Sequence, residues 1–165
     1  MAYNQLATVK AAVAAGLAAV MPVDEQTNEV IPVHYAWPGQ QHQRPTHVWL
    51  AGGRAVSDPA GMVAGRKRRD QRWSFDVIVE CARRGQTVDD TGTNVLQRDA
   101  DEIVEEIAGL VDEWVAANPK LGQTTTNDGH VDYGLVDSFT LEHGPTPDGV
   151  AARMIVTLTY RIRPR

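Results

Sequence analysis

Residues 73–81 have the sequence WSFDVIVEC, in which apolar and polar side chains alternate. One side of an extended chain carries Trp73, Phe75, Val77, Val79 and Cys81, and the other carries Ser74, Asp76 and Glu80, with Ile78 as the apolar exception. A period of two residues is typical of a strand with one buried face. The stretch therefore predicts a half-buried β-strand.

A second pattern begins after the polar segment 84–94. Apolar side chains recur there at spacings of three and four residues: Ile103, Val104, Ile107, Leu110, Val111, Trp114 and Val115. This spacing predicts a helix that packs on one side. We expect it to end at Ala117-Asn118, because Asn118 suits a left-handed cap and Pro119 cannot continue a helix.

Two further alternating strands are predicted toward the C-terminal end of the sequence. The first places Val131, Tyr133, Leu135, Phe139 and Leu141 on one parity, with Asp137 as the exception. The second runs from Val150 to Ile162. The intervening segment 144–149, GPTPDG, has the composition of a hairpin turn.

The N-terminal part predicts a helix over residues 3–20 and two short strands, at 31–37 and 47–50. Pro32 suggests that the first of these strands lies at a sheet edge or at a strand start. Residues 51–70 contain four glycines and Pro59 and end in a basic cluster. Because Gly and Pro interrupt regular structure, this segment predicts a long loop, which is uncommon within one domain unless it is functional or disordered.

The predicted order is helix, strand, strand, long loop, strand, helix, strand, strand. It indicates a single α+β domain over residues 1–165, with a mostly antiparallel sheet and two main helices on one of its faces. A length of 165 residues, with 42% hydrophobic and 22% charged residues, is typical of one globular domain. The apolar segment 11–21 is too short to cross a bilayer, so no membrane partner is expected.

The sequence offers no catalytic or metal-binding pattern. The five histidines lack the spacing of a zinc helix, the serines lack the glycine-flanked nucleophile turn, and residues 61–66 do not satisfy a phosphate-loop motif. Cys81 is the only cysteine, and its place in the strand predicts a buried, inert thiol. We therefore predict no enzyme, no catalytic residue, no metal and no cofactor; a small hydrolase has only scattered Asp and His residues in its favour.

Two charged groups remain as candidate interaction sites. The basic group consists of Arg66, Lys67, Arg68, Arg69 and Arg72; the acidic helix face consists of Asp101, Glu102, Glu105, Glu106, Asp112 and Glu113, with only Arg98 to balance it. Either group alone has the ordinary interpretation of a solvated surface. Together they are complementary, and an acidic face meeting a basic loop on a neighbouring copy would favour head-to-tail association.

Several segments together resemble the tail terminator proteins of long-tailed, siphovirus-type bacteriophages. They are an N-terminal helix, the Arg-rich lead into a strand at 69–80 (RDQRWSFDVIVE), an acidic helix closing on ANPKLG at 117–122, and a last strand containing TLTYRI at 157–162. The resemblance covers most of the chain and depends on the order and length of these segments. The long segment 51–70 departs from a minimal member of the family.

This resemblance implies a structural subunit that assembles into a homohexameric ring. The ring would cap the tail tube, end tail polymerisation and provide the head-joining surface. The implied partners are other copies of the chain, the major tail tube protein and the head–tail connector proteins, with possible non-specific contact with DNA in the lumen. The implied location is the head-proximal end of the virion tail, and the host cytoplasm during assembly.

Two alternatives stay open at this point. A head completion or neck protein also forms rings at the head–tail junction, but on the portal side. A small nucleic-acid-binding module would use the basic group, although no aromatic residues are interleaved with its arginines for stacking. The net charge of -5 does not favour free nucleic acid as a partner of the whole surface.

Overall fold

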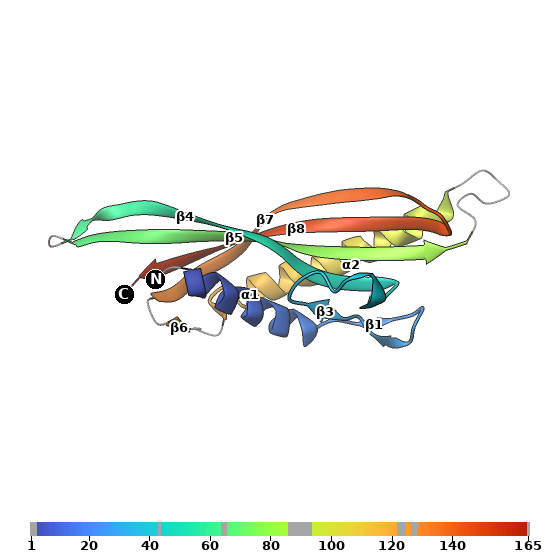
Figure 1. Ribbon diagram of the computed structural model, residues 1–165, viewed down its shortest axis with the longest axis horizontal. Helices are drawn as coiled ribbons and strands as arrows, with labels where there is room; N and C mark the ends of the chain where they lie inside the picture. Colours follow the sequence, from blue (N-terminus) through green and yellow to red (C-terminus); the bar gives the residue numbers. More distant parts are fainter. Residues whose placement is uncertain are drawn as a thin grey trace.

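The computed structural model describes residues 3–42, 44–63, 66–85, 94–121, 125–126 and 129–164. A six-stranded sheet runs along the molecule, and two helices lie on one of its faces (Figure 1). The elements are, in chain order, α1 (Tyr3–Ala18), β1 (Val23–Asp24), β2 (Glu29–Val30), β3 (Val33–His34), the short 3-10 helix η1 (Gln40–His42), β4 (Thr46–Val63), β5 (Arg66–Arg84), α2 (Val95–Ala117), β6 (Thr125–Thr126), β7 (Gly129–Thr146) and β8 (Gly149–Pro164). The α+β class predicted from the sequence is confirmed.

The strand order in the main sheet is β3-β4-β5-β8-β7-β6, and β1 and β2 form a separate hairpin. Only the short β3–β4 pairing is parallel, and all other pairings in the sheet are antiparallel. Two long hairpins, β4–β5 and β7–β8, have their turns at opposite ends of the molecule (Figure 1). They are joined through the central pair β5–β8.

The core lies between the helices and one face of the sheet. The alternating residues 73, 75, 77, 79 and 81 of β5 are all buried, as the pattern predicts, and β8 presents its even-numbered residues 152–162 to the same side. Val9, Val13 and Leu17 of α1 join this cluster, as do Val104, Ile107, Ala108, Val111 and Val115 of α2. Removal of these apolar surfaces from water is the main driving force for this arrangement.

Helix α2 begins and ends where the sequence predicts. The Asn94 side chain accepts a hydrogen bond from the Gln97 backbone N–H, which satisfies a donor of the first turn. At the other end the Asn118 side chain donates to the Trp114 carbonyl over 2.9 Å. The predicted left-handed conformation of Asn118 is wrong, because its φ is -125°. Its side-chain and backbone N–H groups bond to carbonyls of the last turn in this other conformation.

The predicted long loop at 51–70 is also wrong. Strand β4 continues to Val63 and β5 starts at Arg66, and the two pair along this segment. Gly52 and Gly53 lie in one irregularity of the β4 register, between Ala51 and Arg54, and Gly61 lies in a second, which begins after Pro59. Bulges tolerate such residues within a strand, and Gly52 takes φ +62° in the first of them. Lys10 of α1 fixes this bulge by donating to the Gly52 carbonyl over 3.2 Å.

The single parity predicted for β7 is wrong for a similar reason. Register shifts occur between Val131 and Tyr133 and between Val136 and Ser138, the second at Asp137. Each shift reverses the face to which the following side chains point. Tyr133 therefore pairs with Arg161 on the face away from the helices, whereas Phe139 pairs with Val156 on the helix face.

The predicted strand at 31–37 is reduced to the two residues of β3, Val33 and His34, which pair in parallel with Val48 and Trp49. Tyr35 and Trp37 lie beyond it and are exposed. The neighbouring Pro32 has no N–H for a longer ladder, although its carbonyl accepts from the Val48 N–H over 3.0 Å.

Candidate assembly surfaces

The basic group predicted at 66–72 lies in the first part of β5, in the hairpin end that projects away from α2 (Figure 1). The side chains of Arg66, Lys67, Arg68 and Arg69 lie outside the described residues. Arg72 is described and exposed, and its register partners are Val56 on β4 and Arg161 on β8. The basic residues therefore sit on a paired strand and not on a loop.

More arginines surround Arg72 on the face away from the helices. Arg161 lies directly opposite it, and Arg54 pairs with the next residue of β5 on that face, Ser74. The guanidinium of Arg161 also lies 6.0 Å from the Tyr133 ring centroid. Sequence reasoning missed this group because it joins strands far apart in the chain.

The acidic helix face is exposed on α2, with one exception. Glu102, Glu105, Glu106, Asp112 and Glu113 are exposed to solvent, and Glu102 forms an ion pair with Arg98 across one turn at 2.7 Å. Asp101 instead contacts the β7–β8 hairpin of its own chain. The acidic helix face available to a partner is therefore these five residues.

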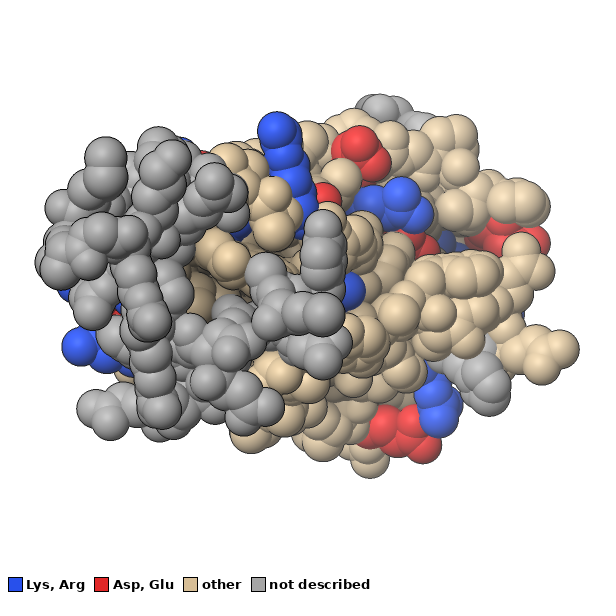
Figure 2. All heavy atoms as spheres, turned by 60° about the vertical axis from the view of Figure 1, so that its left-hand side comes forward, with Lys and Arg blue, Asp and Glu red and all other residues tan. Residues whose placement is uncertain are grey.

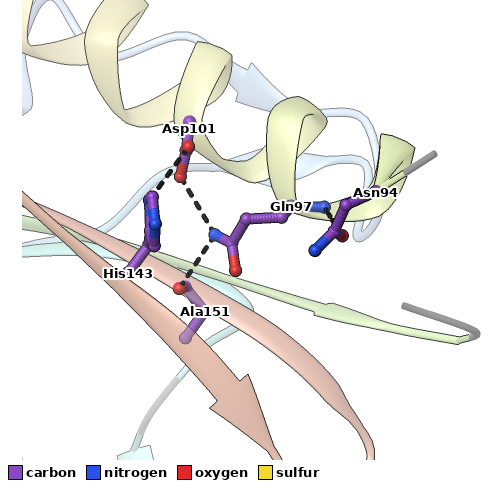
Figure 3. Close-up of polar contacts among 5 residues, drawn as sticks. All are labelled: Asn94, Gln97, Asp101, His143 and Ala151. Carbon is purple, nitrogen blue, oxygen red and sulfur yellow. Dashed lines mark hydrogen bonds and ion pairs between the residues drawn. The ribbon is translucent and has the colours of Figure 1, made fainter. Parts of the chain in front are cut away.

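Asp101 belongs to a polar contact that fixes the start of α2 on the sheet (Figure 3). Its two carboxylate oxygens lie 3.1 Å from His143 Nδ1 and 3.0 Å from the Gln97 side-chain nitrogen. The same Gln97 amide donates to the Ala151 carbonyl over 3.2 Å. Gln97 is buried, so these hydrogen bonds satisfy its amide where water is largely excluded. The contact is structural, and it ties α2 to both strands of the hairpin.

Charges of both signs occur elsewhere on the described surface. Figure 2 shows, in the coloured part of the face that it presents, Lys and Arg side chains beside Asp and Glu among uncharged residues. One such pair joins Arg163 and Asp132 at 3.1 Å. Another joins Arg153 and Glu80 at 2.7 Å. Exposed pairs of this kind contribute little to stability, roughly 0–1 kcal/mol each.

His47 is a buried polar residue on the face of the sheet away from the helices. The rings of His47 and Trp49 stack with their centroids 5.1 Å apart, and the Arg153 guanidinium lies 5.7 Å from the Trp49 centroid. Burial lowers the pKa of His47, although the hydrogen bond to the Arg44 carbonyl and the charge of Glu80 act in the opposite direction. His47 is therefore neutral in the folded protein near pH 7.

Cys81 is buried, as predicted, and accepts a hydrogen bond from the Thr46 hydroxyl over 3.5 Å. Burial raises the pKa of the thiol, which disfavours the reactive thiolate. Among the described residues, no group of three or more His, Cys, Asp or Glu side chains is arranged to hold a metal ion. In the same part of the chain, no helix is long and apolar enough to span a membrane.

Both edges of the sheet carry accessible apolar side chains. On β7 the exposed fraction is 36% for Tyr133, 39% for Leu135, 50% for Phe139 and 38% for Leu141, and on β4 it is 37% for Val56. Exposed apolar residues scattered singly are ordinary, but β7 carries two pairs, Tyr133 and Leu135 on the face away from the helices and Phe139 and Leu141 on the helix face. These two pairs, the acidic helix face and the basic group are the surfaces through which a partner could bind.

No family model matches this chain, and no curated protein sequence matches it. Among solved structures, one chain of the virion of a native gene transfer agent (GTA) particle has a similar fold, with a TM-score of 0.60. The alignment covers 93% of this chain and 93% of that chain at 14% sequence identity. The chain therefore shares its α+β fold, over nearly its whole length, with that virion chain.

Proposed function

We propose that this protein is a structural component of a phage-like virion and, more specifically, a tail terminator. In this role several copies form a ring that caps the tail tube, ends its polymerisation and presents the head-joining surface. The observation that carries the proposal is the shared fold with a chain of a virion particle over 93% of both chains. Because fold alone does not define function, the surfaces must supply the remaining argument.

The positions of the charged groups favour association between copies. The hairpin end that holds the basic group projects away from α2, which carries the acidic helix face (Figure 1). Contact between the two groups would therefore join different parts of two molecules. Such contacts are heterologous, and they close into a ring when the rotation between copies permits it.

The candidate surfaces are also those of a structural protein. A ring that joins two assemblies needs a side that binds its neighbour and two ends that bind different partners. Open strand edges, an acidic helix face and a charged hairpin end provide such surfaces. Neither a metal nor a cofactor enters this proposal, and the protein acts by assembly and not by catalysis.

The direct test is control of tube length. The chain is co-expressed with the tail tube protein encoded in the same genome, and the tubes are imaged by negative stain with and without it. We expect tubes of limited length that carry one additional ring at one end. Tubes of unchanged length without bound protein would overturn the terminator proposal.

The same fold similarity is compatible with a head completion or neck protein, so the partner decides between the two. Binding to the portal-side connector, with no effect on the tube, would identify the neck protein. If the protein bound neither the tube nor the connector, and bound DNA with an affinity that falls steeply with salt, it would instead be a nucleic-acid-binding module. Light scattering at low and high salt gives the mass of the assembled species in each case.

A further inference from the structure

The main sheet is unpaired along most of both edges. On one side β6 pairs only with Gly129 and His130, which leaves residues 131–146 of β7 without a neighbouring strand among the described residues. On the other side β3 pairs only with Val48 and Trp49, and α1 contacts β4 at Gly52, which leaves residues 54–63 of β4 without a neighbouring strand among the described residues. At ~3.3 Å per residue, these edges are roughly 50 Å and 30 Å long.

We propose that the free edge of β7 in one copy pairs antiparallel with the free edge of β4 in the next copy, so that one sheet continues around the assembly. The pairing assigns a partner, a second copy of this chain, to both edges at once. It rests on the ring of the proposed function, but it does not depend on what the ring binds.

Strand direction supports this pairing. The four long strands β4, β5, β8 and β7 are antiparallel to their neighbours, so β4 and β7 run in opposite directions. A second copy related by a rotation can therefore bring its β4 beside β7 and continue the antiparallel alternation. Its helices then stay on the same side of the sheet, and the next β7 edge is again free.

Closure distinguishes this arrangement from a simple dimer. Two copies that met through their β7 edges would still expose both β4 edges, which are templates for further association. Pairing of β7 with β4 leaves no such edge once the ring closes. It is a heterologous contact, the kind that generates a ring.

The side chains of β7 also fit burial by a neighbouring strand. Its regular stretch from Ser138 to Gly144, which ends before Pro145, contains one charged residue, Glu142, and no bulge. Exposed strand edges are usually protected by several charges, by proline or by bulges. Here Phe139 and Leu141 stand exposed on the helix face of the edge. An added strand would cover these apolar surfaces.

Cysteine cross-linking tests the proposal. Val56 lies on the face away from the helices, as do Leu135, Ser138, Thr140 and Glu142 of β7. Val56→Cys is combined in turn with a cysteine at each of these four positions, and the assembled protein is oxidised. Because a disulfide needs its Cβ atoms about 4 Å apart, we expect the position in register to give a ladder of covalent multimers that ends at the ring size.

Three controls define the contact. Val56→Cys combined with Leu141→Cys should give no ladder, because Leu141 lies on the opposite face. Each single variant should remain unlinked, and the parent should as well because Cys81 is buried. Equal mixtures of two single variants in register should give covalent dimers but no longer species.

Each contrary result has a distinct meaning. A ring that assembles without any ladder would overturn the edge pairing and leave the proposed function intact. Cross-linking of a β7 single variant to itself would show a two-fold contact and also overturn the pairing. Cross-linking of β7 to the tube protein would assign the edge to that partner. Failure to assemble even with tube protein present would overturn both proposals.

Discussion

Two helical glycines should respond in opposite directions to replacement by alanine. A Cβ at Gly109 of α2 would have no heavy atom of the described residues within 4 Å, whereas a Cβ at Gly16 of α1 would overlap the Trp114 indole. Alanine is favoured over glycine in a helix interior by about 1 kcal/mol. Gly109→Ala should therefore raise the free energy of unfolding by about that amount.

Gly16→Ala gains less from the backbone, about 0.5 kcal/mol, because the residue lies in the last turn of α1. Against this gain stands the displacement of the Trp114 indole, which is half-buried between the helices. Overpacking of this kind costs about 1–3 kcal/mol. We expect Gly16→Ala to lower the free energy of unfolding by about 0.5–2.5 kcal/mol.

Urea unfolding followed by circular dichroism measures both effects without relying on tryptophan fluorescence. Trp114→Leu removes the ring that the new methyl group would meet, so Gly16→Ala should cost less in that background than in the parent. The double-mutant cycle isolates this coupling. If Gly16→Ala stabilised the protein as much as Gly109→Ala does, the close contact between α1 and α2 would be refuted.

Three further predictions follow from buried and charged groups. The Tyr160 hydroxyl is buried without a hydrogen-bond partner among the described residues. Tyr160→Phe should therefore leave the free energy of unfolding unchanged or raise it by up to ~1 kcal/mol. A loss above ~1 kcal/mol in urea unfolding would contradict this. Burial lowers the pKa of His47, so the folded protein is most stable above the unfolded pKa of 6.5 and loses stability as pH falls toward the folded pKa. His47→Gln should therefore flatten the decline of the urea midpoint between about pH 7 and 5.5. An unchanged decline would refute the lowered pKa of His47. Replacing residues 66–69 by glutamate should leave the unfolding free energy within ~0.5 kcal/mol but weaken assembly in light scattering, whereas unchanged assembly would exclude the basic group from the interface.

The spacing of apolar residues within one continuous segment was enough to predict α2 and the buried face of β5. The spacing of apolar residues in 103–115, with Asn94 before the helix and Asn118 after it, located α2. The alternation of residues 73–81 identified the buried face of β5, because one covered face requires a period of two. Neither element depends on a partner for its pattern to be visible in the sequence.

The prediction failed where the outcome depends on a neighbouring strand. Gly52 and Pro59 suggested a loop, but β5 pairs with β4 through this segment and accommodates them at register shifts. A shift at Asp137 likewise separates the faces of Leu135 and Phe139, which no single-strand parity can anticipate.

The candidate site was predictable only in part. The acidic residues were identified from the helix pattern, but the role of Asp101 depends on His143, which lies 42 positions away in sequence. The basic group was visible as a cluster, while the opposed pair Arg72–Arg161 appears only once β5 and β8 are aligned. The free edges are a property of strand order, which the sequence does not display.

The central position of β8 has a consequence for folding during synthesis. Its pairing with β5 joins residues far apart in the chain, for example Ser74 and Thr159, which hydrogen-bond across a separation of 85 positions. At ~5–20 residues per second, a ribosome needs about 4–17 s to add that many residues. During this interval β5 has β4 beside it but lacks its other neighbour, and contacts of such long range also slow folding itself. The nascent protein therefore passes through a stage in which β5, whose alternate residues 73–81 are buried in the finished fold, is open on one side. Its soluble yield should depend on how that stage is protected.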